Sequence, residues 1–305
     1  QAVPPKLWEP LSQALSSLAR DFNTKCLVMS ATQPGFLSSA VESVDAPENH
    51  FACRDRYELE LLHREPMKLE SFCLTIEEKL ATDWRDKGVM IVLNTRKSAR
   101  CVRDFIADLG DERPLHFISA DVVPHERLAS IAEIKRNEPC IVVATQCVEA
   151  GVDIDLEIVV RDWAPLDSII QVAGRCNRRG LCERGTAQIV KLLSDSGRPY
   201  AGMVYDNDLL TITGEVFCGL DTVAEETVYP LISNYYAKLL ERKDKGNGYF
   251  QDWSNWHSHI KVRELLRDEG EKFEFVVASE DPDGEQSLRD AMRDTLAIKD
   301  RWQRK

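Results

Sequence analysis

The segment from Gly88 to Leu193 alternates continuously apolar runs with stretches in which apolar residues recur every three or four positions. The first pattern predicts strands buried on both faces, and the second predicts amphipathic helices. Strands are expected at Val89–Leu93, Leu115–Ile118, Cys140–Ala144, Glu157–Val160 and Ala187–Leu193. Helices are expected at Ser98–Leu109, from Pro124 to about Arg136, and at Ser168–Arg175 with Asp167 as its N-cap. The predicted fold class is therefore α/β, a doubly wound parallel sheet covered by helices.

The flanking segments have weaker patterns. Trp8–Leu18 has a helical pattern, Lys25–Met29 a strand pattern, and residues 41–85 the mixed pattern of a connector. Helical patterns return at Val223–Leu240 and Ser287–Ile298, so we expect a mainly helical C-terminal accessory region. The chain has 305 residues, which is enough for two domains with cores of their own.

Composition excludes several classes of protein. No apolar run reaches the length that crosses a bilayer, and the first residues do not form a signal peptide, so a cytoplasmic protein without a membrane partner is expected. Nine cysteines with no CxxC pair favour reduced thiols. The net charge of −12 argues against a protein that coats nucleic acid. Basic residues nevertheless cluster locally, at Arg175, Arg178, Arg179, Arg184 and Lys191.

The most specific constellation is the segment that runs from Gln171 to Arg178. Gln171, Arg175 and Arg178 are spaced i, i+4, i+7, which predicts that they share one face of a helix. Gly174 leaves room beside them for a close approach. Two guanidinium groups beside an amide are suited to binding phosphate oxygens. Taken alone, the same pattern also describes a solvated basic helix face; its context of strands and helices favours the phosphate site.

Two further segments follow predicted strands, at the sheet edge where open α/β sheets bind ligands. After Cys140–Ala144 come Thr145 and Gln146, suited to nucleic-acid phosphates, and then Gly151 and Asp153, suited to a nucleotide. After Val89–Leu93 come Thr95 and Arg96, which offer further phosphate contacts. Thr95 is also a favourable helix N-cap, and the two roles are compatible.

Several expected features of a nucleotide-hydrolysing enzyme are missing from the sequence. It has no GxxxxGK[ST] phosphate loop, and no Asp-Glu pair follows an apolar strand, so half of an ATP site is absent. We find no clustered His-Asp pair of an HD nuclease. His257 and His259 have no matching carboxylates, and no metal site is predicted from them.

Taken together, these segments resemble superfamily 2 helicases, and more closely the helicase part of Cas3, the nuclease-helicase of type I CRISPR systems. Ser30-Ala31-Thr32 resembles the SAT motif, Ile91–Thr95 motif IV, Ala144–Asp155 motif V and Gln171–Arg178 motif VI. The phrase Arg161–Gln171 points to Cas3 in particular. Motif VI often begins Gln-Arg, and Val172 replaces that first arginine here.

The resemblance implies a role for each matched residue. Arg175 and Arg178 look like the arginine fingers of ATP hydrolysis, Gln171, Gly151 and Asp153 like nucleotide contacts, and Ser30, Ala31 and Thr32 like the segment that couples hydrolysis to strand movement. Thr95, Arg96, Thr145 and Gln146 would contact single-stranded DNA. ATP with Mg²⁺ is the implied cofactor, with most of its ligands outside this chain. The implied partners are the first RecA-like lobe, an HD nuclease and the Cascade surveillance complex.

The implied organisation places the end of a first RecA-like lobe at 1–40, a connector at 41–85, the second lobe at 86–195 and the accessory domain at 196–305. The chain would be half of a motor, inactive alone. Two alternatives remain open. The lobe could be a non-catalytic docking module, or it could belong to another superfamily 2 helicase that acts on RNA.

Overall fold

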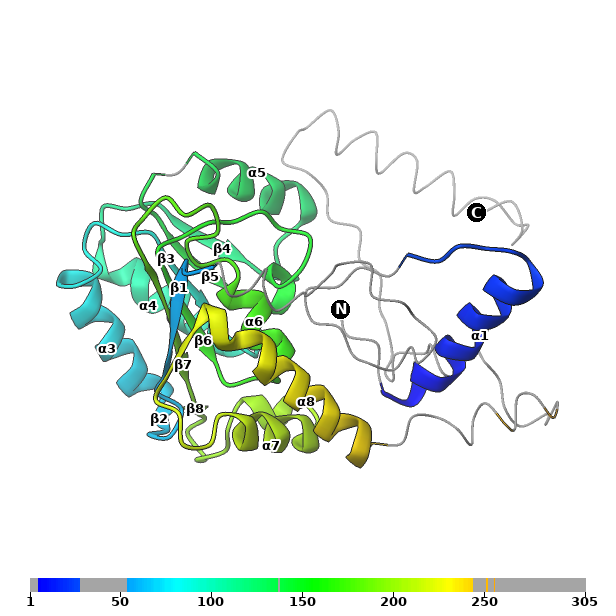
Figure 1. Cartoon of the computed structure of the whole chain (residues 1–305). Coiled ribbons are helices and arrows are strands. Elements are labelled where there is room, and N and C mark those ends of the chain that lie inside the picture. Colours follow the sequence, from blue (N-terminus) through cyan, green and yellow to red (C-terminus); the bar gives the residue numbers. More distant parts are fainter. Residues whose placement is uncertain (1–4, 28–53, 137, 244–250, 252–254, 256–305) are drawn as a thin grey trace, which may run out of the picture. The chain divides into compact units, whose positions relative to one another are not determined.

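The computed structural model describes residues 5–27, 54–136, 138–243, 251 and 255. Contacts divide the chain into a unit of residues 1–262 and a second unit of 263–305, which lies outside the described residues. The first unit is built on a seven-stranded sheet of order β4-β5-β3-β6-β7-β1-β9 (Figure 1). Every neighbouring pair in this sheet is parallel except β1 and β9. The predicted α/β fold class is confirmed.

The strands of the sheet are β1 (Tyr57–Leu61), β3 (Val89–Val92), β4 (Leu115–Ile118), β5 (Ile141–Ala144), β6 (Ile158–Asp162), β7 (Gly185–Val190) and β9 (Thr222–Ala224). All except β1 and β9 lie close to predicted strand positions, and no strand was predicted at those two. The run predicted as one strand at Ala187–Leu193 is divided, because Leu192–Leu193 forms β8 and pairs with β2 (Met67–Lys68) in a separate two-stranded sheet.

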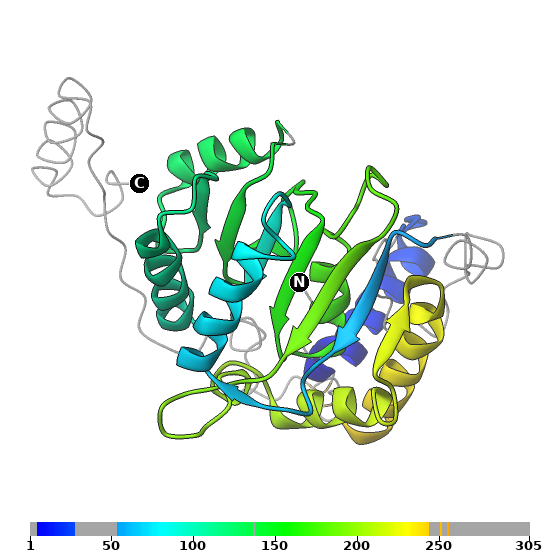
Figure 2. The same cartoon turned by 90° about the vertical axis from the view of Figure 1, so that its left-hand side faces the viewer.

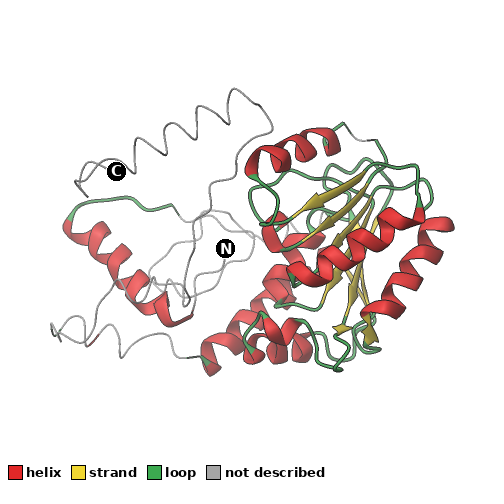
Figure 3. Cartoon of the chain, turned by 180° about the vertical axis from the view of Figure 1, so that it is seen from behind, coloured by secondary structure: helices red, strands yellow, loops and turns green. Residues whose placement is uncertain are grey.

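Helices cover both faces of the sheet, as Figures 2 and 3 show. One face packs against α3 (Leu69–Ala81) and α4 (Arg96–Leu109). The opposite face packs against α6 (Leu166–Ala173), α7 (Asn207–Val216) and α8 (Val228–Arg242), and α5 (Pro124–Ile134) adds Ile134 to the same core.

Successive residues of the central strands enter these two cores alternately. In β3, Val89 and Ile91 pack towards α3 and α4, whereas Met90 and Val92 pack into the opposite core. All four side chains are fully buried. A strand with both faces covered must be apolar at every position, which is why these runs are continuous in the sequence.

The flanking predictions had mixed outcomes. The helix at Trp8–Leu18 is confirmed as α1 (Trp8–Asp21). Lys25–Leu27 is not strand, and the rest of that predicted strand lies outside the described residues. Within the predicted connector, β1 joins the main sheet between β7 and β9. Its sequence, YELEL, alternates apolar and charged residues, and only every second residue is buried.

Part of the predicted accessory region is described. The helix predicted at Val223–Leu240 begins later, at Val228, because Thr222–Ala224 pairs with β1 as β9. The helix predicted at Ser287–Ile298 lies outside the described residues. In the part of the chain that the structure describes, no helix has both the length and the apolar character needed to cross a membrane.

The start of β7 packs tightly against the turn that follows α6. A Cβ atom added to Gly185 would lie 2.5 Å from Cys176 Sγ and 3.0 Å from both Asn177 Cβ and the Glu157 carbonyl oxygen. We therefore expect Gly185→Ala to lower the free energy of unfolding by about 1–3 kcal/mol in urea titration. Gly202→Ala is the control, because its nearest neighbour would lie at an ordinary 3.7 Å. Equal stability of the two variants would contradict this packing.

Candidate functional site

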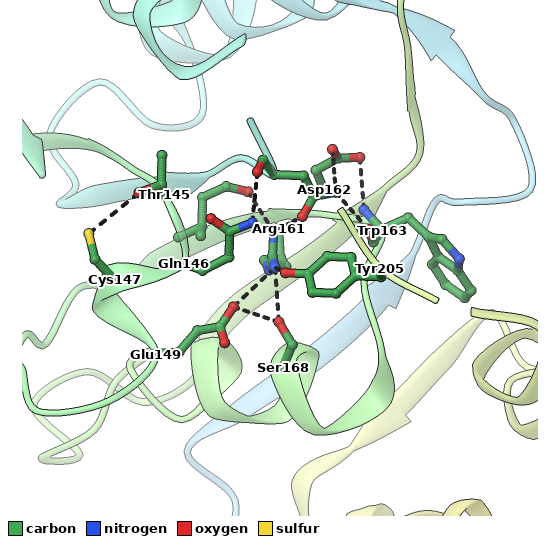
Figure 4. Close-up of polar contacts among 11 residues, drawn as sticks. Thr145, Gln146, Cys147, Glu149, Arg161, Asp162, Trp163, Ser168 and Tyr205 are labelled. Carbon is green, nitrogen blue, oxygen red and sulfur yellow. Dashed lines mark hydrogen bonds and ion pairs between the residues drawn. The ribbon is translucent and has the colours of Figure 1, made fainter. Parts of the chain in front are cut away.

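A fully buried arginine lies at the centre of the polar contacts near the carboxyl end of β6. The Arg161 side chain is 0% exposed, although it lies on a strand with apolar neighbours. Its guanidinium donates to Asn94 Oδ1 at 2.7 Å, Ser168 Oγ at 2.9 Å, the Tyr205 hydroxyl at 2.8 Å and Glu149 Oε1 at 3.1 Å (Figure 4). We call Arg161 and these four partners the Arg161 network. It joins the loops after β3 and β5 to the start of α6 and to the segment after β8.

Asn94 extends the network to the neighbouring strand end. Its side-chain amide donates to Asp162 Oδ2 at 2.7 Å and to the Trp163 carbonyl at 2.8 Å. Gln146 in turn donates to the Asn94 carbonyl at 2.7 Å. Burial raises the pKa of Asp162 to about 7, although backbone N–H donors and Arg161 act in the opposite direction. These contacts join the segments that resemble motifs IV and V to the segment Arg161–Gln171.

The start of α6 explains how the network is positioned. The helix begins at Leu166, not Ser168, and Pro165 occupies the N-cap position, so the prediction that Asp167 is the N-cap is wrong. The first helical N–H, that of Leu166, donates to Thr213 Oγ1 at 3.0 Å. A hydroxyl from α7 therefore satisfies the helix terminus, and Ser168 in the first turn is left to bind Arg161 and Glu149.

The predicted single helical face of Gln171, Arg175 and Arg178 is wrong. Helix α6 ends at Ala173, with Gly174 as its C-cap, so only Gln171 lies on the helix. The chain is then held by Leu156, which precedes β6: Leu156 N–H donates to the Arg175 carbonyl, and Asn177 N–H donates to the Leu156 carbonyl. The N–H groups of Arg175 and Cys176 still bond to carbonyls three residues earlier, and Asn177 is the first residue whose N–H turns to Leu156 instead.

Residues 174–180 form a turn, which we call the arginine turn. Asn177 has a positive φ of 44°, a conformation that asparagine adopts more readily than most residues. Its side chain is fixed between the Arg56 and Cys182 carbonyls, at 2.9 and 2.8 Å. The Asp155 carboxylate accepts from the N–H groups of Arg178 and Arg179, at 2.6 and 3.0 Å. The backbone of the arginine turn is therefore pinned from both sides.

The turn still brings its arginines together. Arg175 reaches back to the loop after β5 and donates to the Val148 and Glu149 carbonyls, at 3.2 and 2.7 Å. Arg178 and Arg179 lie 3.5 and 3.4 Å from Asp153, and Lys135 lies 3.6 Å from the same carboxylate. Arg178 and Arg179 are 40% and 39% exposed. The local charge is thus positive and open to solvent.

The pKa values of Arg175 and Asp153 are shifted by the charges gathered in the arginine turn. Burial lowers the pKa of Arg175, and the neighbouring charge of Arg178 lowers it further. Burial acts to raise the pKa of Asp153, but Arg178, Lys135 and Arg179 outweigh it and the pKa is lowered. Asp153 therefore remains a carboxylate at neutral pH.

The predicted nucleic-acid contacts follow the carboxyl ends of β3 and β5. Thr95 is the N-cap of α4, where its hydroxyl accepts from Ser98 N–H at 3.1 Å, so the capping role is confirmed. Arg96 is 66% exposed and pairs with Asp121 at 2.9 Å. Thr145 is only 4% exposed, and its hydroxyl donates to Cys147 Sγ at 3.5 Å. The Gln146 side-chain amide donates to the main-chain carbonyl of Asn94 at 2.7 Å.

The predicted site residues therefore divide between two edges. Thr95, Arg96, Thr145 and Gln146 follow the carboxyl ends of β3 and β5. Helix α6 runs back from that edge, and the arginine turn pairs with Leu156 just before β6 begins, at the amino edge. Gly151 has a positive φ of 74°, and Ser30, Ala31, Thr32, His257 and His259 lie outside the described residues.

Sequence reasoning missed most of the Arg161 network. Asn94 was included only within the segment that resembles motif IV, and Glu149, Ser168 and Tyr205 were not singled out. One signal was present: Arg161 directly follows the apolar run Ile158–Val160, and the buried strand β6 continues through it to Asp162. A charged residue at such a position requires polar partners from other elements.

The region that matches known proteins contains most of the residues of the site. Residues 85–181, which include the arginine turn and most of the Arg161 network, match the family model described as CRISPR-associated nuclease/helicase Cas3, C-terminal. These residues are therefore similar to the C-terminal part of Cas3 nuclease/helicases. The curated Cas3 nuclease/helicase of Methanothermobacter thermautotrophicus is 27% identical over 211 residues, covering 64% of this chain and 25% of that protein.

A second relative and a solved structure show the same similarity. A putative Cas3 nuclease/helicase of Methanocaldococcus jannaschii is 25% identical over 65% of this chain and 29% of that protein. The chain therefore spans roughly a quarter of the length of these Cas3 relatives. The crystal structure of T. fusca Cas3-ATP is similar with a TM-score of 0.52 and 19% identity, over 70% of this chain and 26% of that one. This likeness shows the RecA-like fold of the Cas3-like region.

Proposed function

We propose that this chain supplies the second RecA-like lobe of an ATP-dependent DNA translocase of the Cas3 type, acting in CRISPR defence. The observation that carries the proposal is the charge of the arginine turn. Arg178, Arg179 and Lys135 converge on the single carboxylate of Asp153, in a chain whose net charge is −12. Such a local surplus of positive charge suits the polyphosphate of a nucleotide.

In this proposal, ATP with Mg²⁺ binds between the arginine turn and a first lobe that holds the phosphate loop. ATP supplies the phosphoryl group whose transfer drives movement. Arg178 would leave Asp153 and donate to oxygens of the transferring group, where negative charge is stabilised in the transition state. Arg175, anchored on two carbonyls, would hold a second positive charge beside it. Gln171, Gly151 and Asp153 would shape the nucleotide side of the cleft.

Single-stranded DNA is proposed to run along the carboxyl edge. Arg96 is the most accessible of the four predicted contacts and can exchange Asp121 for a DNA phosphate. Thr95 caps α4, Thr145 donates to Cys147, and Gln146 donates to the Asn94 carbonyl. These three residues would stabilise the loops that carry the DNA contacts. Nucleotide and DNA would then lie at opposite edges of one sheet, joined by α6 and the Arg161 network.

The remaining proposals concern the partners. The first lobe, an HD nuclease and the Cascade complex would act with this chain, in the same longer protein or as separate subunits. We propose that residues 1–40 end the first lobe, with Ser30, Ala31 and Thr32 as the coupling segment. The second lobe would contain 86–195 together with β1, and 196–305 would be the accessory domain.

The proposal is tested by ATP hydrolysis with and without single-stranded DNA. We expect the isolated chain to hydrolyse ATP at the background rate, because it has no phosphate loop to hold the nucleotide. Addition of the first lobe should restore turnover that DNA stimulates. Robust turnover by the isolated chain would refute the division into two lobes. If the assembled protein is also inactive, a docking module is the better description.

A further inference from the structure

We infer that Glu149 is a positioning residue for ATP hydrolysis, acting through Arg175. The inference rests on the proposed function, and it adds a role that neither the motifs nor the comparisons assign. Glu149 lies directly after the short 3-10 helix Gln146–Val148, in the loop between β5 and β6. Arg161 binds its side chain, and Arg175 binds its main-chain carbonyl.

The side chain of Glu149 is bound to the sheet and to α6. Its Oε1 accepts from Arg161 at 3.1 Å and from the Ser168 hydroxyl at 2.6 Å (Figure 4). The main chain of the same residue binds the arginine turn, because its carbonyl accepts from Arg175 Nη2 at 2.7 Å. The position of the Arg175 guanidinium therefore depends on where the Glu149 side chain is anchored.

The anchor is poorly suited to a purely stabilising role. Arg161 is 0% exposed and the Glu149 side chain 18%, and burial of such a pair gives little net stability compared with apolar residues. Among the described residues, Arg161 Nε is also a buried donor without a hydrogen-bond partner. A polar network that is only partly satisfied, in the most buried part of a sheet, is better explained by a need for fixed geometry.

The network also includes the accessory region. The Tyr205 hydroxyl accepts from the Arg161 Nη2 group that also donates to Glu149 and Ser168, and Tyr205 follows the 3-10 helix Ala201–Met203. A contact path therefore runs from Tyr205 through Arg161 and Glu149 to Arg175. Each step is a hydrogen bond of 3.1 Å or less. Removal of the Tyr205 hydroxyl should weaken the same anchor without opening a cavity.

The test compares Glu149→Ala with Glu149→Gln. The glutamine keeps an oxygen that accepts from Arg161 and Ser168, whereas alanine removes it. In the assembled enzyme we expect Glu149→Ala to lower kcat about ten- to a hundred-fold with the KM for ATP changed less than about two-fold, and Glu149→Gln to restore most of kcat. Tyr205→Phe and Ser168→Ala should lower kcat in the same way by a few-fold, and Tyr200→Phe, a half-buried tyrosine outside the Arg161 network, is the matched control.

A second readout needs neither nucleotide nor DNA. Arg175 Nε–H donates to the Val148 carbonyl at 3.2 Å, so its NMR signal, assigned with Arg175→Ala, should exchange slowly with water. We expect fast exchange in Glu149→Ala and slow exchange in Glu149→Gln. Slow exchange in folded Glu149→Ala, or its unchanged kcat, would overturn the inference.

The two proposals can fail separately. If Glu149→Ala does not fold, Ser168→Ala and Tyr205→Phe give the same test: wild-type exchange of Arg175 and wild-type kcat in both would overturn the inference. If the exchange result is as expected but Arg175→Ala and Arg178→Ala both retain wild-type turnover, the proposed function fails, and with it the catalytic part of this inference.

Discussion

Replacement of Arg178 with alanine is expected to reduce the DNA-stimulated ATP turnover of the assembled enzyme by about a thousand-fold or more, the usual value of an arginine finger. The arginine lies in a turn whose backbone is held by Asp155 and Asn177, and its 40% exposed side chain pairs with Asp153 at 3.5 Å. Loss of such an exposed pair costs at most about 1 kcal/mol of stability. Turnover should therefore fall while the urea midpoint stays near that of the wild type.

The adjacent residue provides a matched control. Arg179 is 39% exposed and lies 3.4 Å from the same Asp153 carboxylate, so Arg179→Ala makes the same change in charge. We expect its turnover to remain within a few-fold of the wild type. Arg178→Lys keeps the charge but loses the planar fork, and should recover only a small part of the lost rate. Equal loss in both alanine variants would mean that the turn contributes only general positive charge.

Replacement of Arg161 with alanine is expected to have the largest effect on stability. The change removes the guanidinium that binds Asn94, Glu149, Ser168 and Tyr205, and it leaves the largely buried Glu149 carboxylate without its cationic partner. Breaking a buried pair from one side typically costs about 3–5 kcal/mol. We expect the free energy of unfolding in urea to fall by about that amount, and the melting temperature to fall by roughly 10 °C.

An exposed ion pair is the control for that measurement. Arg64 pairs with Asp221 at 2.7 Å, with side chains 45% and 86% exposed, so Arg64→Ala should cost less than about 1 kcal/mol. Arg161→Lys should still be clearly destabilised, because one ammonium group cannot reproduce the contacts of both guanidinium Nη atoms. An Arg161→Ala protein as stable as Arg64→Ala would show that the buried network does not form.

Much of the architecture could be predicted because it depends on local pattern. The strands β3 and β5 are apolar and buried at every position, β4 and β6 begin with or contain apolar runs, and the positions of all four were predicted to within two residues. β1 could not be found in this way, because YELEL is only half buried. Its place is decided by pairing with β7, more than 120 residues later in the chain.

For the site, residue types and the resemblance to a family could be read from the sequence. It did not determine their geometry. The spacing of Gln171, Arg175 and Arg178 suits a helix, but α6 ends at Ala173 because the backbone then pairs with Leu156. Sequence periodicity cannot show that competition, since the competing partner comes from a segment about twenty residues earlier.

The partners of Arg161 were decided by tertiary structure alone. Asn94, Glu149, Ser168 and Tyr205 come from four separate segments and meet only when the sheet, α6 and the following region are assembled. The predicted strand ends at Val160, whereas β6 continues through Arg161 and Asp162, and the burial of these charged residues makes hydrogen-bond partners necessary. The sequence thus determined the parallel α/β lobe and the presence of its arginines, whereas long-range packing decided which groups hold those arginines in place.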